Sequence, residues 1–253
     1  MDKIIAIANQ KRSVDKTTTA INLAAALGIL VKKILLIDTD PKANATSGLG
    51  LDVENLQGGT YETFQNQSSL QENVRKTATL NVFILPSHLN LVATEIKLVD
   101  NPKREYILKD AKQPVKDDYY YIIINCPFSL GLITLNAITA AGSVIIPIQC
   151  EYFALERLGK LLNTIKSVQH LHNQTLDIEG LLPTMYDPRL RLSNQVIEEI
   201  KTHFPKMTFE TLIRRKLRIN EALSFGSSII QYDVENKGSI NYFNLAHEFL
   251  KKQ

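Results

Sequence analysis

The sequence has no tryptophan and only two cysteines among its 253 residues. Both cysteines, Cys126 and Cys150, lie within or beside apolar runs and lack the short paired spacing of a zinc or iron-sulfur site. No apolar run approaches the roughly 18 residues of a membrane span, and the N-terminus has no basic region followed by a long apolar stretch. These absences exclude a disulfide scaffold. They predict buried free thiols, no membrane partner and a cytoplasmic location.

Composition also excludes a disordered or fibrous chain. The sequence is 44% hydrophobic and 22% charged, as in ordinary globular proteins. Its net charge of +3 is compatible with a polyanionic partner without requiring one. No internal repeat, low-complexity stretch or linker divides the chain, so we predict a single domain over residues 1–253.

Short apolar runs predict strands that are buried on both faces. They alternate with helical patterns, as in a parallel sheet covered by helices on both sides, so the predicted fold class is α/β with a mostly parallel, twisted sheet. We expect strands at Ile4–Ala8, Ile34–Ile37, Val82–Leu85, Ile122–Ile124, Val144–Ile148 and Ile178–Leu182, and helices at Thr17–Leu30, Leu155–His172, Ser193–His203 and Ser239–Lys251. The polar, turn-rich region 55–79 is expected to be a helical excursion with loops.

The turn from Lys11 to Thr19, between the first strand and the first helix, has features of a phosphate-binding loop. Such a loop aims backbone N–H groups at phosphate oxygens and has a helix N-terminus behind it. It also carries a lysine for the β- and γ-phosphates and a hydroxyl for Mg²⁺. Lys16 and Thr17 fit these last two roles. The alternative is an ordinary helix start in which the hydroxyl of Thr17 caps its own backbone.

Further strings of residues follow this loop in a fixed order along nearly the whole chain. They are Thr18–Ala24, Leu36–Pro41, Asn44–Gly50, Ile122–Pro127, Ser129–Gly131, Leu135–Ala137, Pro147–Glu151 and Arg218–Ala222. Together with the loop they resemble the ParA/Soj family of chromosome and plasmid partition ATPases, in the MinD/ParA superfamily. The resemblance implies a P-loop NTPase fold with ATP or ADP and Mg²⁺ as cofactors. It also implies a nucleotide-dependent sandwich homodimer, non-specific DNA binding at the nucleoid, and a ParB/Spo0J-type partner that stimulates hydrolysis.

The resemblance also implies roles for individual residues. Lys11 would reach the nucleotide of the partner protomer, Asp40 would position the attacking water, and these two with Lys16 form the expected catalytic set. Asp38 is expected to support its strand end. The expected nucleotide-binding residues are Lys11, Arg12, Ser13, Val14, Asp15, Lys16, Thr17, Thr18 and Arg215; the expected metal ligands are Thr17, Asp40 and Asn125; and the expected DNA contacts are Arg189, Arg214, Arg215, Lys216 and Arg218.

Several positions depart from the family pattern. Arg12, Ser13 and Asp15 replace the three loop glycines, and a strained non-glycine residue costs about 1–3 kcal/mol. Asp15 also brings a carboxylate beside the phosphates, a repulsion of roughly 4 kcal/mol for unit charges about 4 Å apart at an effective dielectric near 20. Asn125 replaces the aspartate on the Mg²⁺ side, which predicts weaker metal binding. Further departures are Lys42 for glutamine, Phe128 for proline and Arg214 for proline.

These departures predict slow or absent ATP turnover and leave alternatives open. The chain could be a nucleotide-independent DNA-binding or adaptor protein on the same fold, or a sequence deliberately altered at its active site. The basic run from Arg214 to Arg218 could be a solvated loop. The apolar positions of the C-terminal segment 240–252 favour a helix packed on the sheet layer over a membrane-targeting helix, because the segment lacks a broad basic face.

Overall fold

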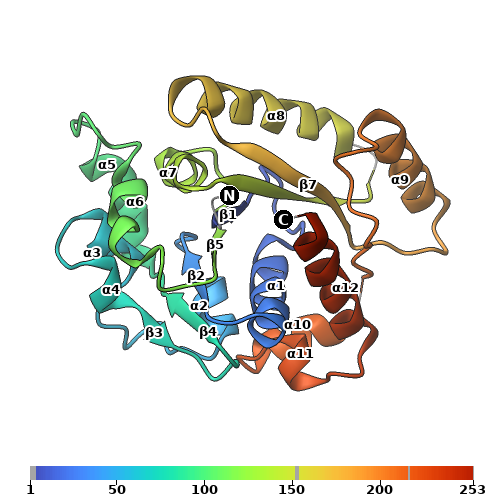
Figure 1. Cartoon of the computed structure of the whole chain (residues 1–253), viewed down its shortest axis with the longest axis horizontal. Helices are drawn as coiled ribbons and strands as arrows, with labels where there is room; N and C mark the ends of the chain where they lie inside the picture. The colour runs from blue at the N-terminus through green and yellow to red at the C-terminus, as the bar shows by residue number, and fades with distance from the viewer. Residues whose placement is uncertain (1–3, 152–153, 216, 253) are drawn as a thin grey trace.

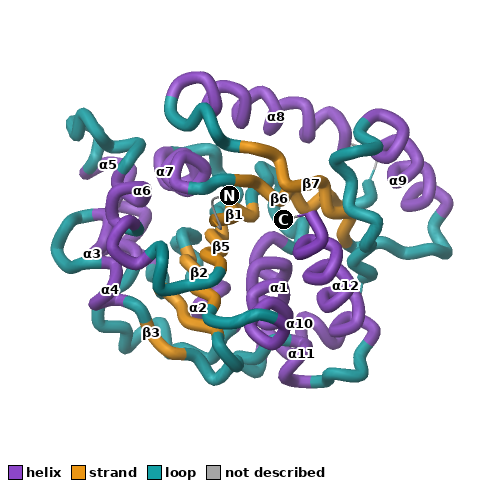
Figure 2. Tube along the Cα trace, in the orientation of Figure 1, coloured by secondary structure: helices purple, strands orange, loops and turns teal. Residues whose placement is uncertain are grey.

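The computed structural model describes residues 4–151, 154–215 and 217–252, in which one sheet lies between two layers of helices (Figures 1 and 2). The strands are β1 Ile4–Ile7, β2 Ile34–Asp38, β3 Arg75–Lys76, β4 Val82–Leu85, β5 Tyr121–Asn125, β6 Ser143–Gln149 and β7 Asp177–Thr184. Their order across the sheet is β3-β4-β2-β5-β1-β6-β7. Only β3 pairs antiparallel within the described residues. The predicted α/β class is therefore confirmed.

The four helices expected from the sequence are present, with end points shifted by at most two residues: α1 Lys16–Leu30, α8 Ala154–Leu171, α9 Arg191–His203 and α12 Lys237–Lys252. The structure adds α2 Asn44–Gly48, α3 Thr60–Phe64, α4 Leu70–Asn73, α5 Thr94–Lys97, α6 Ile107–Ala111, α7 Leu132–Ala140, α10 Leu217–Ser224 and α11 Ile229–Tyr232, with 3-10 turns at Leu89–Ala93 and Gln113–Val115. The region 55–79 contains α3, α4 and the edge strand β3, so it is a helical excursion with one short strand added.

Two hydrophobic clusters, one on each face of the sheet, hold the layers together. On one face, α7 and α8 cover the strands, and Leu161 and Ile165 of α8 are fully or almost fully buried. On the other face, α1 packs against α12, whose Tyr242 and Phe249 are completely buried (Figure 1). This packing confirms the expectation for the C-terminal helix. No helix in the described part of the chain is long and apolar enough to cross a membrane.

The apolar strands explain why one edge of this sheet collects polar groups. Alternate residues of β1, β2 and β5 fall into opposite clusters, so these strands are buried on both faces and have little room for polar side chains along their length. Because the strands are parallel, their carboxyl ends meet at the same edge. The segments after β1, β2, β5 and β6 therefore lie together there.

Candidate functional site

The loop after β1 folds back on itself before α1 begins. The Nζ of Lys16 donates to the carbonyl oxygen of Lys11 over 2.9 Å, and the N–H of Lys11 donates to the Oδ1 of Asn9 over 2.9 Å. The N–H of Thr19 donates to the carbonyl of Asp15 over 2.8 Å, the first bond of the helix. The earlier N–H groups of α1 have no partner within the helix, and this geometry is suited to binding an anion.

Two of the three replaced loop positions have the backbone conformation that glycine tolerates best. Ser13 has φ 57° and Asp15 has φ 63°, both in the left-handed region. The strain expected from the sequence is therefore present at these two positions but not at Arg12, which is absent from the positive-φ residues of the described chain. Strain of this kind persists only where the surroundings hold it. Here the Oγ1 of Thr184, at the end of β7, donates to the carbonyl of the buried Val14 over 3.2 Å.

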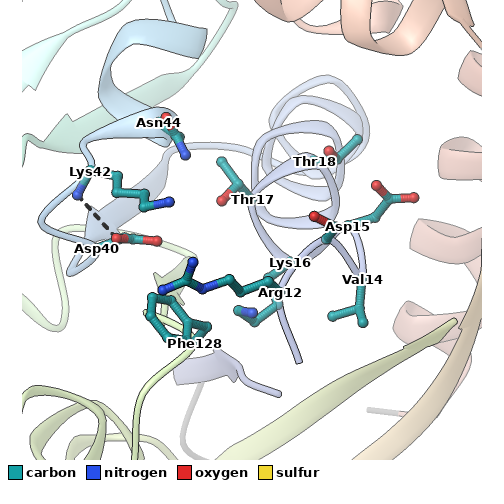
Figure 3. A pocket seen from close by; sticks show the side chains of 11 residues that line it. Arg12, Val14, Asp15, Lys16, Thr17, Thr18, Asp40, Lys42, Asn44 and Phe128 are labelled. Carbon is teal, nitrogen blue, oxygen red and sulfur yellow. Dashed lines mark hydrogen bonds between the residues drawn. The ribbon is translucent and has the colours of Figure 1, made fainter. Parts of the chain in front are cut away.

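A cavity of ≈230 Å³ opens over this loop (Figure 3). It is lined by Arg12, Ser13, Val14, Asp15, Lys16, Thr17, Thr18, Asp40, Lys42, Asn44 and Phe128. The structure thus brings nearly all the expected nucleotide-binding residues together with Asp40. Lys42 and Phe128, noted in the sequence as departures from the family pattern close to this site, also line it. Asn44 was not expected there; it lies six residues after the end of β2, and this position after a strand end is the signal that could have identified it.

Burial shifts the pKa values of two ionisable groups of the loop, Lys16 and Asp15. It lowers the pKa of the Lys16 ammonium, while Cys126 and Asp40 act in the opposite direction. It raises the pKa of Asp15 to about 6, opposed by the positive charge of Arg215. Arg215 is therefore close enough to act on this carboxyl, but it is not among the described residues that line the cavity. Asp15 thus places an ionisable carboxyl on this loop, where a glycine would have none.

The end of β5 meets the end of β2 in a buried polar cluster. Asp38 is completely buried, and its carboxylate accepts from the Nδ2 of Asn125 over 3.0 Å, from both the N–H and the hydroxyl of Thr46, and from the N–H of Asp40. Burial raises its pKa to about 6 despite these bonds. The Oδ1 of Asn125 is buried and has no hydrogen-bond partner among the described residues. An unpaired acceptor of this kind fits a metal-bound water.

Lys11 is held away from the cavity. Its Nζ donates to the Oε1 of Gln149 over 2.8 Å and forms an ion pair with Glu151, while the side-chain amide of Gln149 also donates to Glu151. Lys11 is not among the described residues that line the cavity. No role was expected for Gln149 or Glu151. Their position at the end of β6, next to β1, places them beside the loop.

The expected DNA-contacting arginines lie on neighbouring segments. The N–H of Arg215 donates to the carbonyl of Tyr186 over 3.1 Å, so the segment of Arg214 and Arg215 lies beside the loop that carries Arg189. Two of these arginines are paired. Arg189 makes two hydrogen bonds to Asp187, at 2.9 and 2.6 Å, and Arg218 at the start of α10 forms an ion pair with Asp233. Lys216 lies outside the described residues.

Both curated proteins and solved structures resemble this chain. A family model described as an AAA domain matches residues 2–178. The sporulation initiation inhibitor protein Soj of Bacillus subtilis is 47% identical over 248 residues, covering 98% of each chain. The chromosome partitioning protein ParA of Myxococcus xanthus is 46% identical over 250 residues, covering 99% of this chain and 88% of its own. A Mycobacterium smegmatis cobyrinic acid a,c-diamide synthase, solved with bound ADP and magnesium, has a TM-score of 0.87, with 33% identity and coverage of 99% and 95%.

Proposed function

Because this chain belongs to the ParA/Soj family of chromosome partitioning proteins, we propose that it binds ATP with Mg²⁺ in the cavity over the loop after β1. In this proposal the bound form dimerises face to face and binds DNA without sequence preference for chromosome or plasmid segregation. The main support for this proposal is that Lys16, Thr17 and Asp40 line the same cavity, at the carboxyl edge of the sheet. The solved relative with ADP and magnesium has the same fold, which supports this ligand.

The loop residues would bind the phosphates. The backbone of Ser13, Val14 and Asp15 leads into α1, whose first N–H groups and positive dipole end favour an anion. Lys16, folded back over the loop, supplies a point charge, and Thr17 and Thr18 supply hydroxyls at the cavity wall. The positive charge of Arg215 would partly offset the carboxylate of Asp15.

The residues beside the loop fit a magnesium ion. Thr17 and Asp40 line the cavity with oxygen atoms, and the unpaired Oδ1 of Asn125 lies at the end of the adjacent strand. When bound, Mg²⁺ neutralises negative charge on the phosphates. Asn125 brings an oxygen to this position without a negative charge. Asp40, whose carboxylate accepts from the N–H of Lys42 over 3.0 Å, would orient the attacking water.

Dimerisation would require Lys11 to change partners. In the single chain its ammonium is occupied by Gln149 and Glu151. To act on the nucleotide of a second protomer it would have to leave both. We propose that this exchange accompanies formation of the sandwich dimer, in which Lys11 supplies positive charge in trans.

DNA would contact the surface made by Arg189, Arg214, Arg215 and Arg218, with Lys216 of the same segment. Such contacts neutralise phosphates and release counterions, which gives strong salt dependence and no base reading. The ion pairs with Asp187 and Asp233 reduce the net positive charge of this surface. A cytoplasmic, nucleoid-associated location and a ParB/Spo0J-type partner complete the proposal.

We expect weakened or lost hydrolysis. Ser13 and Asp15 strain the loop, Asp15 brings a carboxylate to the phosphates, and Asn125 removes a charge from the metal side. The same observations favour a second candidate function, a DNA-binding or adaptor protein that works without nucleotide.

Calorimetric titration with Mg-ATP separates these two functions. The proposal expects saturable binding in the unsubstituted chain and its loss in Lys16→Ala, with folding checked by circular dichroism. It also expects DNA binding that increases with ATP. The proposal would be overturned in favour of the adaptor function if the chain does not bind ATP and its affinity for DNA is the same with and without nucleotide.

A further inference from the structure

Arg12 and Phe128 form a contact between two loops of the cavity. The centre of the Arg12 guanidinium lies 4.0 Å from the centroid of the Phe128 ring, a cation–π geometry. Arg12 belongs to the loop after β1, and Phe128 to the segment after β5. The arginine is exposed and the phenylalanine is half-buried, so the pair lies at the rim of the cavity. Both residues depart from the family pattern, which has glycine and proline at these positions.

Stacking leaves the donors of Arg12 available. The ring contacts one face of the guanidinium, and the N–H groups lie in its plane and point outward. Among the described residues, this guanidinium has no hydrogen-bond or ion-pair partner. Figure 3 shows the side chain extending from the loop across Phe128 toward the side of the cavity where Asp40 and Lys42 lie. The ring therefore holds a planar cation in place and leaves its edges free for an anion.

The neighbouring cation, Lys11, is not available in the same way. Gln149 and Glu151 hold its ammonium outside the cavity. Lys16 crosses the base of the loop to bond the carbonyl of Lys11. Of the basic residues on this loop, Arg12 is the one directed over the cavity toward Asp40. Its charge also opposes that of Asp15, three positions along the loop.

We propose that Arg12, positioned by Phe128, binds the terminal phosphate of a nucleoside triphosphate held by its own protomer. This inference rests on the nucleotide-binding role proposed above. Arg12 supplies in cis a positive charge at the Asp40 side of the cavity, before any second protomer is present. The two departures thus act together, because the arginine provides the charge and the aromatic ring orients it.

The nucleotide affinities of the unsubstituted chain and of three variants test whether Arg12 and Phe128 act together on the terminal phosphate. ATP and ADP are titrated by calorimetry into the unsubstituted chain, Arg12→Gln, Phe128→Leu and the double variant. We expect Arg12→Gln to weaken ATP binding about tenfold and ADP binding less than about threefold, because only ATP has the terminal phosphate. Phe128→Leu should have a smaller effect in the same direction. The double variant should match Arg12→Gln alone, since the ring acts through the arginine.

Lys32→Gln is the matched control, because it removes one exposed positive charge at the opposite edge of the sheet, before β2. It should leave both affinities unchanged. Equal ATP binding by the unsubstituted chain and Arg12→Gln would overturn the inference while leaving the proposed function intact. Absence of ATP binding by the unsubstituted chain would overturn both.

The dependence on protein concentration distinguishes action in cis from action in trans. A fluorescent ATP analogue is titrated into the unsubstituted chain and into Arg12→Gln, at protein concentrations far below and far above the one at which the ATP-bound chain dimerises. If Arg12 acts in cis, Arg12→Gln binds the analogue more weakly than the unsubstituted chain at both concentrations. A weakening seen only at the high concentration would contradict the inference and assign Arg12 to the partner's nucleotide.

Discussion

Asn125 donates its side-chain amide to the buried carboxylate of Asp38 over 3.0 Å, where the neighbouring parallel strands β5 and β2 end. The amide lets two polar side chains pack together in a completely buried place without placing two negative charges side by side. Its oxygen remains unpaired within the described chain and faces no competing donor there. This relationship stabilises the meeting of the two strand ends and gives the site one negative charge fewer than a pair of carboxylates would.

Restoring the carboxylate by Asn125→Asp should therefore destabilise the nucleotide-free protein. We expect the free energy of unfolding to fall by about 1–3 kcal/mol, because Asp38 loses a donor and gains a like charge. Mg-ATP should recover more stability in this variant than in the unsubstituted chain. Urea unfolding with and without Mg-ATP measures both effects. The exchange variant Asp38→Asn with Asn125→Asp, which keeps one amide and one carboxylate, should regain most of the nucleotide-free stability.

Replacing the strained loop residues by glycine should separate the effect of backbone strain on stability from the effect of the Asp15 charge on ATP binding. Ser13→Gly and Asp15→Gly should each raise the free energy of unfolding by about 1–3 kcal/mol, because both residues have positive φ. Asp15→Gly should also tighten ATP binding about tenfold more than Ser13→Gly does, since it alone removes a carboxylate. Thermal unfolding and calorimetric titration measure the two quantities. Equal ATP affinities for the two variants would argue against a role for the charge.

Releasing Lys11 should favour the dimer. Glu151→Gln removes the charge that pairs with the ammonium, and we expect ATP-dependent dimerisation to strengthen about twofold to fivefold, the usual value of an exposed ion pair. Sedimentation velocity over a range of concentrations measures this change. Lys11→Ala is the control and should dimerise less than the unsubstituted chain. A Glu151→Gln protein that dimerises no better would mean that the ion pair does not restrain Lys11.

The two cysteines should be inert in the folded protein. Both are free and buried, as expected from the sequence, and burial raises the pKa of Cys126 and of Cys150 to about 12. At pH 8 both buried thiols are therefore protonated, so an aromatic disulfide reagent should react with neither until urea is added. The unfolded thiols ionise near pH 9 and the folded ones only near pH 12. Stability should therefore decrease as the pH rises through this interval.

Salt dependence should identify the arginines that contact DNA. Arg214→Ala should reduce the slope of log affinity against log salt by about one, as expected for the loss of one phosphate contact. Arg189→Ala should have a smaller effect, because Asp187 already pairs with this guanidinium. Fluorescence anisotropy with a random duplex measures the slopes. Asp187→Asn is the matched control and should strengthen binding by freeing Arg189.

The family and the fold class were predictable because they depend on local patterns. Apolar runs such as Ile34–Ile37 could be buried on both faces only in a sheet covered by helices on each side, and the resemblance to partition proteins extends over nearly the whole chain. The short antiparallel strand β3 was missed. It has two residues, Arg75 and Lys76, which no hydrophobic pattern marks, and its pairing with β4 is set by the surrounding fold.

The site was only partly predictable. The loop, Asp40 and the proximity of Arg215 follow from the motif order, but the bonds of particular side chains do not. Nothing in the sequence indicates that Lys11 forms an ion pair with Glu151, or that the amide of Asn125 donates to Asp38. These interactions depend on how the ends of the strands are arranged in space. The contact of Arg12 with Phe128 likewise joins residues more than a hundred positions apart.

The hydrogen bond from the hydroxyl of Thr184 to the carbonyl of Val14 links the loop after β1 to the end of β7. Beyond Thr184 the chain runs directly into Tyr186, whose carbonyl holds the N–H of Arg215, and then to Arg189. An outward movement of the loop would therefore either break this hydrogen bond or move the end of β7 with it. In the second case Arg189 and Arg215 would move together with the wall of the cavity, because both are tied to the segment that follows β7.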